Sequence, residues 1–288
     1  MAGSIGELLR LDSATLAQAL GCSAADARRE VQILLCRALG VEQAWLLAHP
    51  ESTLEGGLQE RYGAMLARRL AQEPIVYILG EREFYGLLFE VTPDVLIPRP
   101  ETELMVELAL ARVPKAAPWR ILDLGTGSGC IAITLASLLP HVRVVATDLS
   151  GAALAVAGRN ARRHRATNID LRKGSWFEPV GTQRFDLIVS NPPYIPSTDI
   201  ADLDIEVRDH DPLRALDGGT DGLDAYRIIA PEAAQLLVPG GLLVVEVGHH
   251  QSDDVAGLMT VSGLTLPGPA KADLGGIRRA VSGQKKPR

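Results

Sequence analysis

The chain has 288 residues, a length that suits a catalytic domain joined to a smaller companion domain. Hydrophobic residues make up 47% of it and charged residues 22%, which is ordinary for an α/β protein with a sizeable core. The net charge is −6, whereas a protein that grips nucleic acid mainly through phosphates usually carries a basic excess. Composition therefore argues against general nucleic-acid binding.

The three cysteines, Cys22, Cys36 and Cys130, lie far apart and form no CxxC pair. We therefore expect neither a disulfide framework nor a zinc site, and a reducing compartment fits best. The N-terminus lacks a basic segment followed by an apolar one, and no apolar run reaches membrane-spanning length. These observations predict a cytoplasmic protein that does not bind membranes.

Residues 1–80 are expected to form an N-terminal helical domain. Apolar residues recur at helical spacing over 24–39, with Ser23 as the N-cap and Gly40 as the stop. A second helix is predicted over 54–71, before Pro74. The region contains no catalytic constellation, so we expect it to serve packing or partner binding.

A β-hairpin linker with its turn near Gly86 is predicted over 81–95, and a catalytic domain over 96–288. The catalytic domain opens with the proline-rich segment VLIPRPETE, after which a helix carries Glu101 and Glu103 in its first turn. Short β-rich runs then alternate with segments of helical period. The runs are RILDL, VRVVATD, IDLRK, FDLIVS and LLVVEV. Such alternation predicts βαβ units around a mostly parallel sheet, a Rossmann-like α/β fold.

A glycine-rich loop follows the first of these strands and leads directly into a helix. It has the sequence Asp123-Leu124-Gly125-Thr126-Gly127-Ser128-Gly129, and Asp148 ends the next strand. Glycines allow a sharp turn and let a ligand touch bare backbone. A carboxylate in the position of Asp148 suits the two ribose hydroxyls of a nucleoside.

Two cofactors compete for this loop. A nicotinamide dinucleotide is typically bound by GxGxxG, but the loop reads GxGxG and Asp123 would repel a phosphate. An acid there suits a ligand with an amino group, such as the methionine part of S-adenosyl-L-methionine. The pattern favours S-adenosyl-L-methionine, while a dinucleotide and a purely structural turn stay open as alternatives.

The fourth strand runs straight into Asn191-Pro192-Pro193-Tyr194, the NPPY motif. An amide or aromatic amino nitrogen is a poor nucleophile because its lone pair is delocalised. We hypothesise that the Asn191 side-chain oxygen and the Pro192 carbonyl accept its two N–H bonds, which aims the lone pair at the methyl donor. The Tyr194 ring would pack on the planar acceptor group. The alternative interpretation is a proline-rich turn that merely ends a strand.

With these residues in view, the chain resembles the bacterial peptide chain release factor glutamine methyltransferases (the PrmC/HemK family) from about Glu73 to near the C-terminus. DLGTGSG and NPPY are shared with many methyltransferases, whereas LIPRPETE, GSWFEP and DGLDAYR are more specific. The resemblance implies methylation of the side-chain nitrogen (N5) of the glutamine in the GGQ motif of release factors. It also implies the class I S-adenosyl-L-methionine-dependent methyltransferase fold, with a seven-stranded sheet, a reversed last strand and a substrate-recognising N-terminal domain.

Site residues follow from the same resemblance. Gly125 to Gly129, Asp148, Trp176 and Asn191 would contact the cofactor, and Asn191 to Tyr194 would hold the glutamine. Simple packing is the alternative for Trp176. The segment DLGGIRRAVSG is less rich in valine than the last strand of the family, which leaves that strand open.

The expected partner is thus a release factor, without direct nucleic-acid binding and without a metal. Two other functions stay open: an adenine-amino methyltransferase of DNA or RNA, and a non-catalytic protein that binds S-adenosyl-L-methionine. Arg99 either helps to close the site or forms a salt bridge with a nearby glutamate. The acidic segment 196–219 either guides a basic substrate loop or is a solvated surface segment. For Glu246 a structural role is favoured over one at the site.

Overall fold

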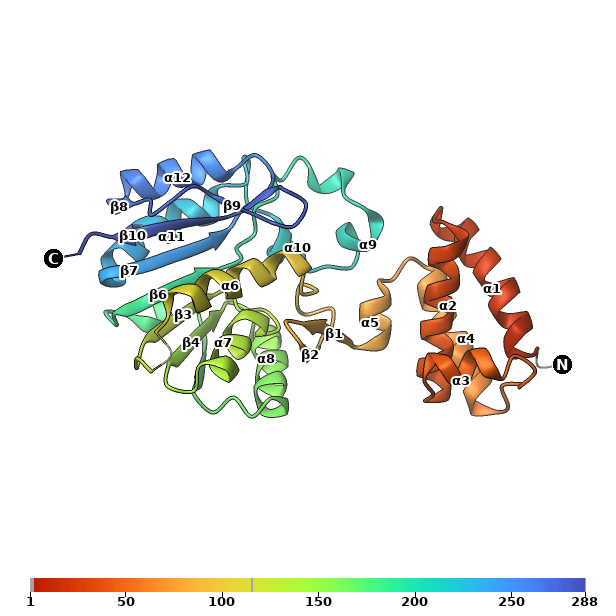
Figure 1. Ribbon diagram of the computed structural model, residues 1–288. Coiled ribbons are helices and arrows are strands. Elements are labelled where there is room, and N and C mark those ends of the chain that lie inside the picture. Colours follow the sequence, from red (N-terminus) through yellow and green to blue (C-terminus); the bar gives the residue numbers. More distant parts are fainter. Residues whose placement is uncertain (1–2, 115, 288) are drawn as a thin grey trace. The chain divides into compact units, whose positions relative to one another are not determined.

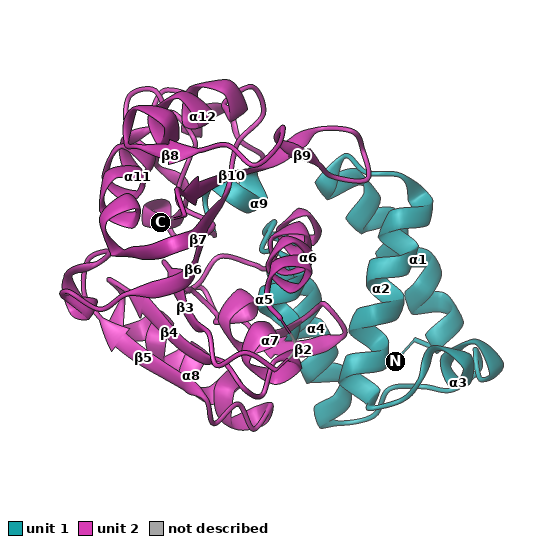
Figure 2. Ribbon diagram, turned by 60° about the vertical axis from the view of Figure 1, so that its left-hand side comes forward, with its two compact units in different colours: residues 1–80, 205–210 teal, residues 81–204, 211–288 magenta. Residues whose placement is uncertain are grey.

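The computed structural model describes residues 3–114 and 116–287 of the chain (Figure 1). The chain packs into two compact units, coloured separately in Figure 2. Unit 1 comprises Met1–Gly80 and Ile205–His210, and unit 2 comprises Glu81–Asp204 and Asp211–Arg288. The short segment at 205–210 therefore belongs with the N-terminal helices, although the chain reaches it from the sheet of unit 2.

Unit 1 is helical. Its helices are α1 (Ile5–Leu20), α2 (Ala24–Leu39), α3 (Gln43–Ala48), α4 (Gly57–Leu70), α5 (Ile75–Leu79) and α9 (Ile205–Arg208). The predicted helix over 24–39 is confirmed as α2, with the Ser23 hydroxyl accepting a hydrogen bond from the Asp26 amide and Gly40 in the left-handed conformation. The prediction of a helix over 54–71 was too long at its start. Gly56 has a φ of 53°, which no right-handed helix allows, so α4 begins at Gly57.

A buried arginine ties α9 to the other helices of unit 1. The Arg69 side chain on α4 is 3% exposed and pairs with Glu30 of α2 at 2.6 Å and with Glu206 of α9 at 2.5 Å. A buried guanidinium needs such partners, because an unpaired charge in a protein interior is costly. The charge of Arg69 therefore gives the 205–210 segment a fixed place in unit 1.

Unit 2 begins with the antiparallel pair β1 (Glu81–Phe84) and β2 (Leu87–Glu90). Its large sheet has the strand order β5-β4-β3-β6-β7-β10-β8, with β9 beside β10. The parallel strands are β3 (Arg120–Leu124), β4 (Arg143–Asp148), β5 (Ile169–Lys173), β6 (Phe185–Ser190) and β7 (Leu237–Glu246). The predicted α/β fold with a mostly parallel sheet is confirmed.

Helices cover both faces of this sheet, and the strands show why. Adjacent residues of a strand face opposite sides, so Ile121 packs into one buried cluster and Leu122 into the other. The first cluster takes α6 (Glu103–Arg112), α7 (Cys130–Leu138) and α8 (Gly151–Arg163). The second takes α11 (Asp224–Leu236) and α12 (Ser252–Val261). Figure 1 shows α6, α7 and α8 on one side of the strands and α11 and α12 on the other. Both faces are thus buried, as a parallel sheet requires.

The last long strand, β10 (Arg278–Lys285), runs antiparallel to β7, so the reversed last strand is confirmed. Two short strands pair with it, β8 (Leu264–Thr265) and β9 (Lys271–Ala272). Among the described residues the sheet therefore has eight strands, where the resemblance implies seven.

The strand order places a switch point in the sheet between β3 and β6. From β3 the chain moves outward through β4 and β5, then returns to the other side of β3 as β6. Open α/β sheets bind ligands beyond the carboxyl ends of the strands at such a point. The glycine loop follows β3 and the NPPY segment follows β6, so both leave the sheet there.

The connections of unit 2 also contain η1 (Pro100–Thr102), η2 (Glu178–Val180), η3 (Ile200–Asp202) and α10 (Leu213–Leu216). Across residues 3–114 and 116–287, no helix is both long and apolar enough to cross a membrane.

Candidate active site

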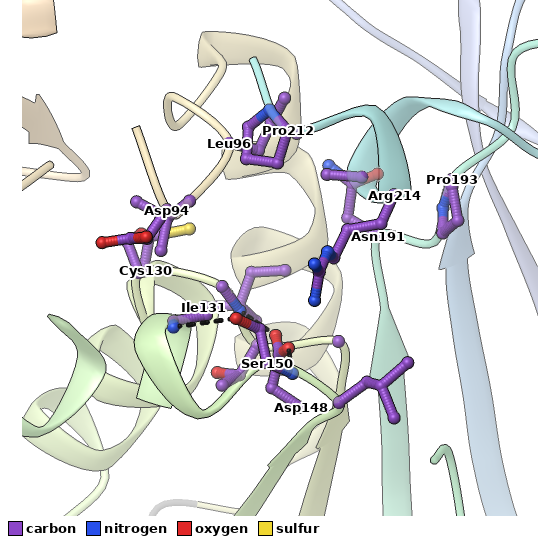
Figure 3. Close-up of a pocket in the computed structure, with 18 of the residues that line it drawn as sticks. Asp94, Leu96, Cys130, Ile131, Asp148, Ser150, Asn191, Pro193, Pro212 and Arg214 are labelled. Carbon is purple, nitrogen blue, oxygen red and sulfur yellow. Dashed lines mark hydrogen bonds between the residues drawn. The ribbon is translucent and has the colours of Figure 1, made fainter. Parts of the chain in front are cut away.

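One cavity in unit 2 brings the two sequence motifs together. Its lining includes Gly125 to Ser128 from the glycine loop, Asp148 from the end of β4, and Asn191 and Pro193 from the segment after β6. Figure 3 shows the side chains of Asp148, Asn191 and Arg214 around the same space. Residues that are distant in the sequence therefore face a single ligand-sized opening at the switch point of the sheet.

The glycine loop is held in one shape by backbone hydrogen bonds. Gly125, Gly127 and Gly129 have φ values of 70°, 55° and 83°, a region where other residues are strained. The amides of Gly125 and Thr126 both donate to the Thr147 carbonyl, at 2.9 Å and 3.0 Å. The loop thus presents bare backbone to the cavity in a conformation that these hydrogen bonds stabilise.

Asp148 is oriented by the same loop. One carboxylate oxygen accepts a hydrogen bond from the Gly127 amide at 2.9 Å, and the other accepts one from the Ser150 amide at 2.8 Å. Each carboxylate oxygen has two lone pairs, so each keeps one acceptor position for a ligand hydroxyl. The geometry fits the predicted role of Asp148 as an acceptor for two ribose hydroxyls.

Trp176 lines the cavity next to the glycine loop. Its φ is 42°, an unfavourable value for a large side chain, and its carbonyl accepts a hydrogen bond from the Thr147 hydroxyl at 3.0 Å. Backbone strain of this kind persists only where the surroundings impose it, and it concentrates at binding sites. The ring lies close to Gly125, since a Cβ there would be 4.0 Å from Trp176 Cζ3.

Asp123 is buried beside the loop and is not among the residues that line the cavity. It is 1% exposed, and one carboxylate oxygen accepts a hydrogen bond from the Thr126 hydroxyl at 2.6 Å. Among the residues that the structure describes, the other oxygen has no hydrogen-bond partner, nor has the buried Ser128 hydroxyl. Burial, together with the nearby charge of Asp148, raises the pKa of Asp123 to about 7. A carboxylate so poorly solvated would gain from a cationic group bound nearby.

The four residues of the NPPY segment divide into two pairs. Asn191 and Pro193 line the cavity, whereas Pro192 and Tyr194 are not among its lining residues. The Tyr194 hydroxyl donates instead to the Glu246 carboxylate at 3.4 Å, and burial raises the pKa of Tyr194 far above its usual value. The packing of the Tyr194 ring against an acceptor group stays a prediction.

Gly218 and Gly222, which the sequence analysis did not name as site residues, pack against the backbone of the NPPY segment. A Cβ on Gly218 would lie 2.8 Å from Tyr194 Cα and 2.9 Å from the Pro193 carbonyl oxygen. A Cβ on Gly222 would lie 2.3 Å from the Tyr194 carbonyl oxygen. The glycines of DGGTDGLDAYR are therefore needed because backbone packs directly on backbone here. The close repetition of glycine before a helix was the available signal.

Arg99 forms its ion pair with Asp211 at 2.6 Å, not with a glutamate, and it also lines the cavity. The pair joins the VLIPRPETE segment to the acidic segment. Other acidic residues of 196–219 are likewise engaged: Glu206 with Arg69, Asp209 with Arg208, and Asp217 with Ser197. Much of the charge in this segment thus serves internal contacts.

Several lining residues lay outside the sequence-based prediction. They are the run from Asp94 to Pro98, together with Thr102, Cys130, Ile131, Thr147, Leu149, Ser150, Ala153, Gly174, Ser175, Pro212, Arg214 and Ala215. They come from loops whose position follows from tertiary packing, so local pattern gave no signal for them. Within the described residues, no cluster of three or more His, Cys, Asp or Glu side chains is arranged to hold a metal ion.

Comparison with known proteins decides the family. Residues 7–80 match the model of the "PrmC N-terminal domain", and residues 102–205 match that of the "Methyltransferase small domain". The release factor glutamine methyltransferase of Geobacter sulfurreducens is 49% identical over 90% of this chain and 90% of its own. That of Bradyrhizobium diazoefficiens is 45% identical over 91% of this chain and 89% of its own.

The chain belongs to the release factor glutamine methyltransferase family. Solved structures of lower identity support the methyltransferase fold. A methyltransferase from Pyrococcus furiosus aligns with a TM-score of 0.55 at 21% identity, over 78% of this chain and 99% of its own. The hMettl16 catalytic domain aligns with a TM-score of 0.56 at 15% identity, over 77% of this chain and 83% of its own.

Proposed function

We propose that this chain transfers the methyl group of S-adenosyl-L-methionine to the side-chain amide nitrogen of the glutamine in the GGQ motif of peptide chain release factors. The observation that carries the proposal is the single cavity shared by the glycine loop, Asp148 and Asn191. It occurs in a member of a family whose relatives are named for release factor glutamine methylation. The proposal puts a cofactor site and an acceptor site next to each other in this cavity.

The cavity suits this cofactor on three counts. The left-handed glycines Gly125 and Gly127 leave room for close approach to backbone, the two oxygens of Asp148 keep free acceptor positions, and Asp123 is a buried acid with an unpaired oxygen. When bound, the cofactor supplies a methyl group carried by a positively charged sulfur. Asp148 would hold the ribose hydroxyls, Trp176 would cover the adenine, and Asp123 would offset the charge of the amino group.

The acceptor amide needs to be oriented rather than deprotonated. Its nitrogen lone pair is delocalised into the carbonyl, so the amide reacts only when the two N–H bonds are held and the lone pair is aimed. The Asn191 side-chain oxygen and the Pro192 carbonyl would accept those two N–H bonds and stabilise the positive charge that develops on nitrogen. The nitrogen becomes acidic as it gains the methyl group, so its proton leaves without a dedicated strong base.

Unit 1 is proposed to recognise the release factor. We assign substrate recognition to an N-terminal domain over 1–80, a linking hairpin to 81–95 and catalysis to 96–288. Two observations support this assignment. The cavity is lined by residues from 94–215, and residues 7–80 match a separate family model. A chain lacking 1–80 would then keep its cofactor site but lose most of its activity on an intact release factor.

Methylation of an adenine amino group is the alternative, because NPPY would offer the same two acceptors to an exocyclic NH2. It is disfavoured by the net charge of −6 and by the names of the relatives. The test is methyl transfer from labelled S-adenosyl-L-methionine to a purified release factor, to its GGQ-to-GGA variant and to plasmid DNA. We expect label on the wild-type release factor alone. Label on DNA alone, or equally on the GGA variant, would remove glutamine as the target.

A further inference from the structure

Two buried polar side chains connect to Asn191 through consecutive hydrogen bonds. The Asn191 Nδ2 donates to the Thr102 hydroxyl at 3.1 Å, and that hydroxyl donates to the Glu246 carboxylate at 2.7 Å. Thr102 and Glu246 are each 2% exposed. Thr102 comes from η1 and Glu246 from the end of β7, so three segments that are far apart in the sequence meet here. The hydrogen-bonded series Asn191, Thr102 and Glu246 is called the relay below.

The relay has a direction, because a hydroxyl carries only one hydrogen. An ionised carboxylate can only accept, so Thr102 must give its hydrogen to Glu246 and can then only accept from Asn191. The Asn191 nitrogen must therefore face Thr102, which leaves Oδ1 on the other branch of the planar amide. Among the described residues, no group donates a hydrogen bond to this oxygen, and the Asn191 side chain lines the cavity.

The geometry points to Thr102 and Glu246 as positioning residues that select which end of the Asn191 amide meets the methyl acceptor. This inference rests on the proposed function. With the relay intact, an oxygen faces the N–H of the substrate amide and accepts from it. If Asn191 turned over, its NH2 would face the substrate NH2, and two donors would oppose each other. Thr102 lines the cavity and Glu246 does not, and the effect requires only the hydrogen bonds that link them to Asn191.

The charge of Glu246 sets the direction of the relay. Burial raises the pKa of Glu246 to about 7, against the lowering effects of its hydrogen bond from Thr102 and of the Arg279 charge. A protonated Glu246 can donate to Thr102, which then becomes free to donate to Asn191 Oδ1. The titratable and charged groups that act on Glu246 from the surrounding elements are Glu101, Cys130, Tyr194, Tyr226 and Arg279. At saturating cofactor, kcat should therefore fall as the pH drops below about 7.

Thr102→Val in the full chain tests the relay, because it removes the hydroxyl and keeps the shape. We expect kcat on a release factor to fall by roughly 10- to 100-fold, with the cofactor Kd unchanged. Thr102→Ser should restore both kcat and the pH profile, since serine returns the hydroxyl. Thr134→Val is the matched control, because the Thr134 hydroxyl is buried and has no hydrogen-bond partner within residues 3–114 and 116–287.

Two further measurements keep the inference falsifiable if Thr102→Val does not fold. Glu246→Gln should abolish the acidic limb of the kcat profile, because no group in the relay then titrates. The side-chain amide signal of Asn191 in nitrogen-15 NMR spectra, identified by its loss in Asn191→Ala, should shift as the pH passes about 7 in the wild type only.

Equal kcat and equal pH profiles for Thr102→Val and Thr102→Ser would overturn the inference while the proposed function stands. An unchanged acidic limb in Glu246→Gln would do the same. Failure of the wild type to methylate a release factor would overturn the proposed function, and this inference with it.

Discussion

The buried acid beside the glycine loop gives a sharp prediction, in which one substitution removes a pH dependence of stability and weakens cofactor binding. Asp123→Asn removes the charge of a side chain that is 1% exposed and has one unpaired oxygen. The pKa of Asp123 is about 7 in the folded chain, because burial penalises the ionised form. An unfolded aspartate has a pKa of about 3.9. Folding therefore favours the protonated acid.

The direction in which stability changes with pH follows from the difference between the folded and unfolded pKa of Asp123. Because the folded pKa is raised, the stabilising contribution of Asp123 is complete below pH ~4 and is lost as the pH rises through about 7. Between these values the native state holds one proton more than the unfolded state, and stability falls by ~1.4 kcal/mol per pH unit. The asparagine variant lacks this slope. Its stability relative to the wild type should thus rise by about 2 kcal/mol from pH 5 to pH 7.

Denaturant unfolding of the cofactor-free wild type and variant at pH 5, 6, 7 and 8 measures the difference. The comparison cancels the parallel contribution of Glu246, which both proteins retain. An unpaired amide N–H in the variant adds a cost that does not depend on pH, so the slope carries the result rather than the absolute stability. The variant should also bind S-adenosyl-L-methionine more weakly, by calorimetry. Stability curves that run parallel from pH 5 to pH 8 would refute the reasoning.

Three more substitutions separate the roles of the site, the loop behind it and unit 1. Asn191→Ala should lower kcat on a release factor by roughly 100- to 1000-fold with the cofactor Kd nearly unchanged, and near-normal turnover would remove Asn191 as an acceptor. Gly218→Ala should lower the free energy of unfolding by about 1–3 kcal/mol and lower kcat, because its Cβ would press on the Tyr194 backbone. Gly257→Ala is the control, because the space around its Cβ is open. Equal kcat values for the two variants would contradict the packing argument. Arg69→Ala should lower the free energy of unfolding by about 3 kcal/mol, because it leaves Glu30 and Glu206 without their partner. Arg159→Ala removes an exposed ion pair and should lower it by under about 1 kcal/mol. Similar losses in the two variants would contradict the structural role of Arg69.

Several features that depend on local pattern could be predicted from the sequence, although the start of the helix predicted over 54–71 was wrong. The strand Arg120–Leu124 and the helix Ala24–Leu39 appear as predicted, because alternation and capping act within a few residues. The glycine loop, Asp148 and Asn191 were found for a similar reason, since each directly follows a strand of the parallel sheet.

Contacts between side chains on distant segments could not be predicted from the sequence. The partners of Asn191 are Thr102 and, through it, Glu246, which lie on segments brought together only by the folded sheet. The ion pairs Arg99–Asp211 and Arg69–Glu206 also join distant segments, and no local periodicity signals them. The hydrogen bond from the Tyr194 hydroxyl to Glu246 is another such contact between distant segments.

Fragmentation mass spectrometry of a release factor treated with this enzyme and S-adenosyl-L-methionine shows which atom receives the methyl group. The proposed function predicts a single methyl group on the side-chain nitrogen of the GGQ glutamine, absent when Asn191→Ala replaces the wild-type enzyme. A methyl group on any other residue, or an unmodified glutamine beside an active enzyme, would contradict it.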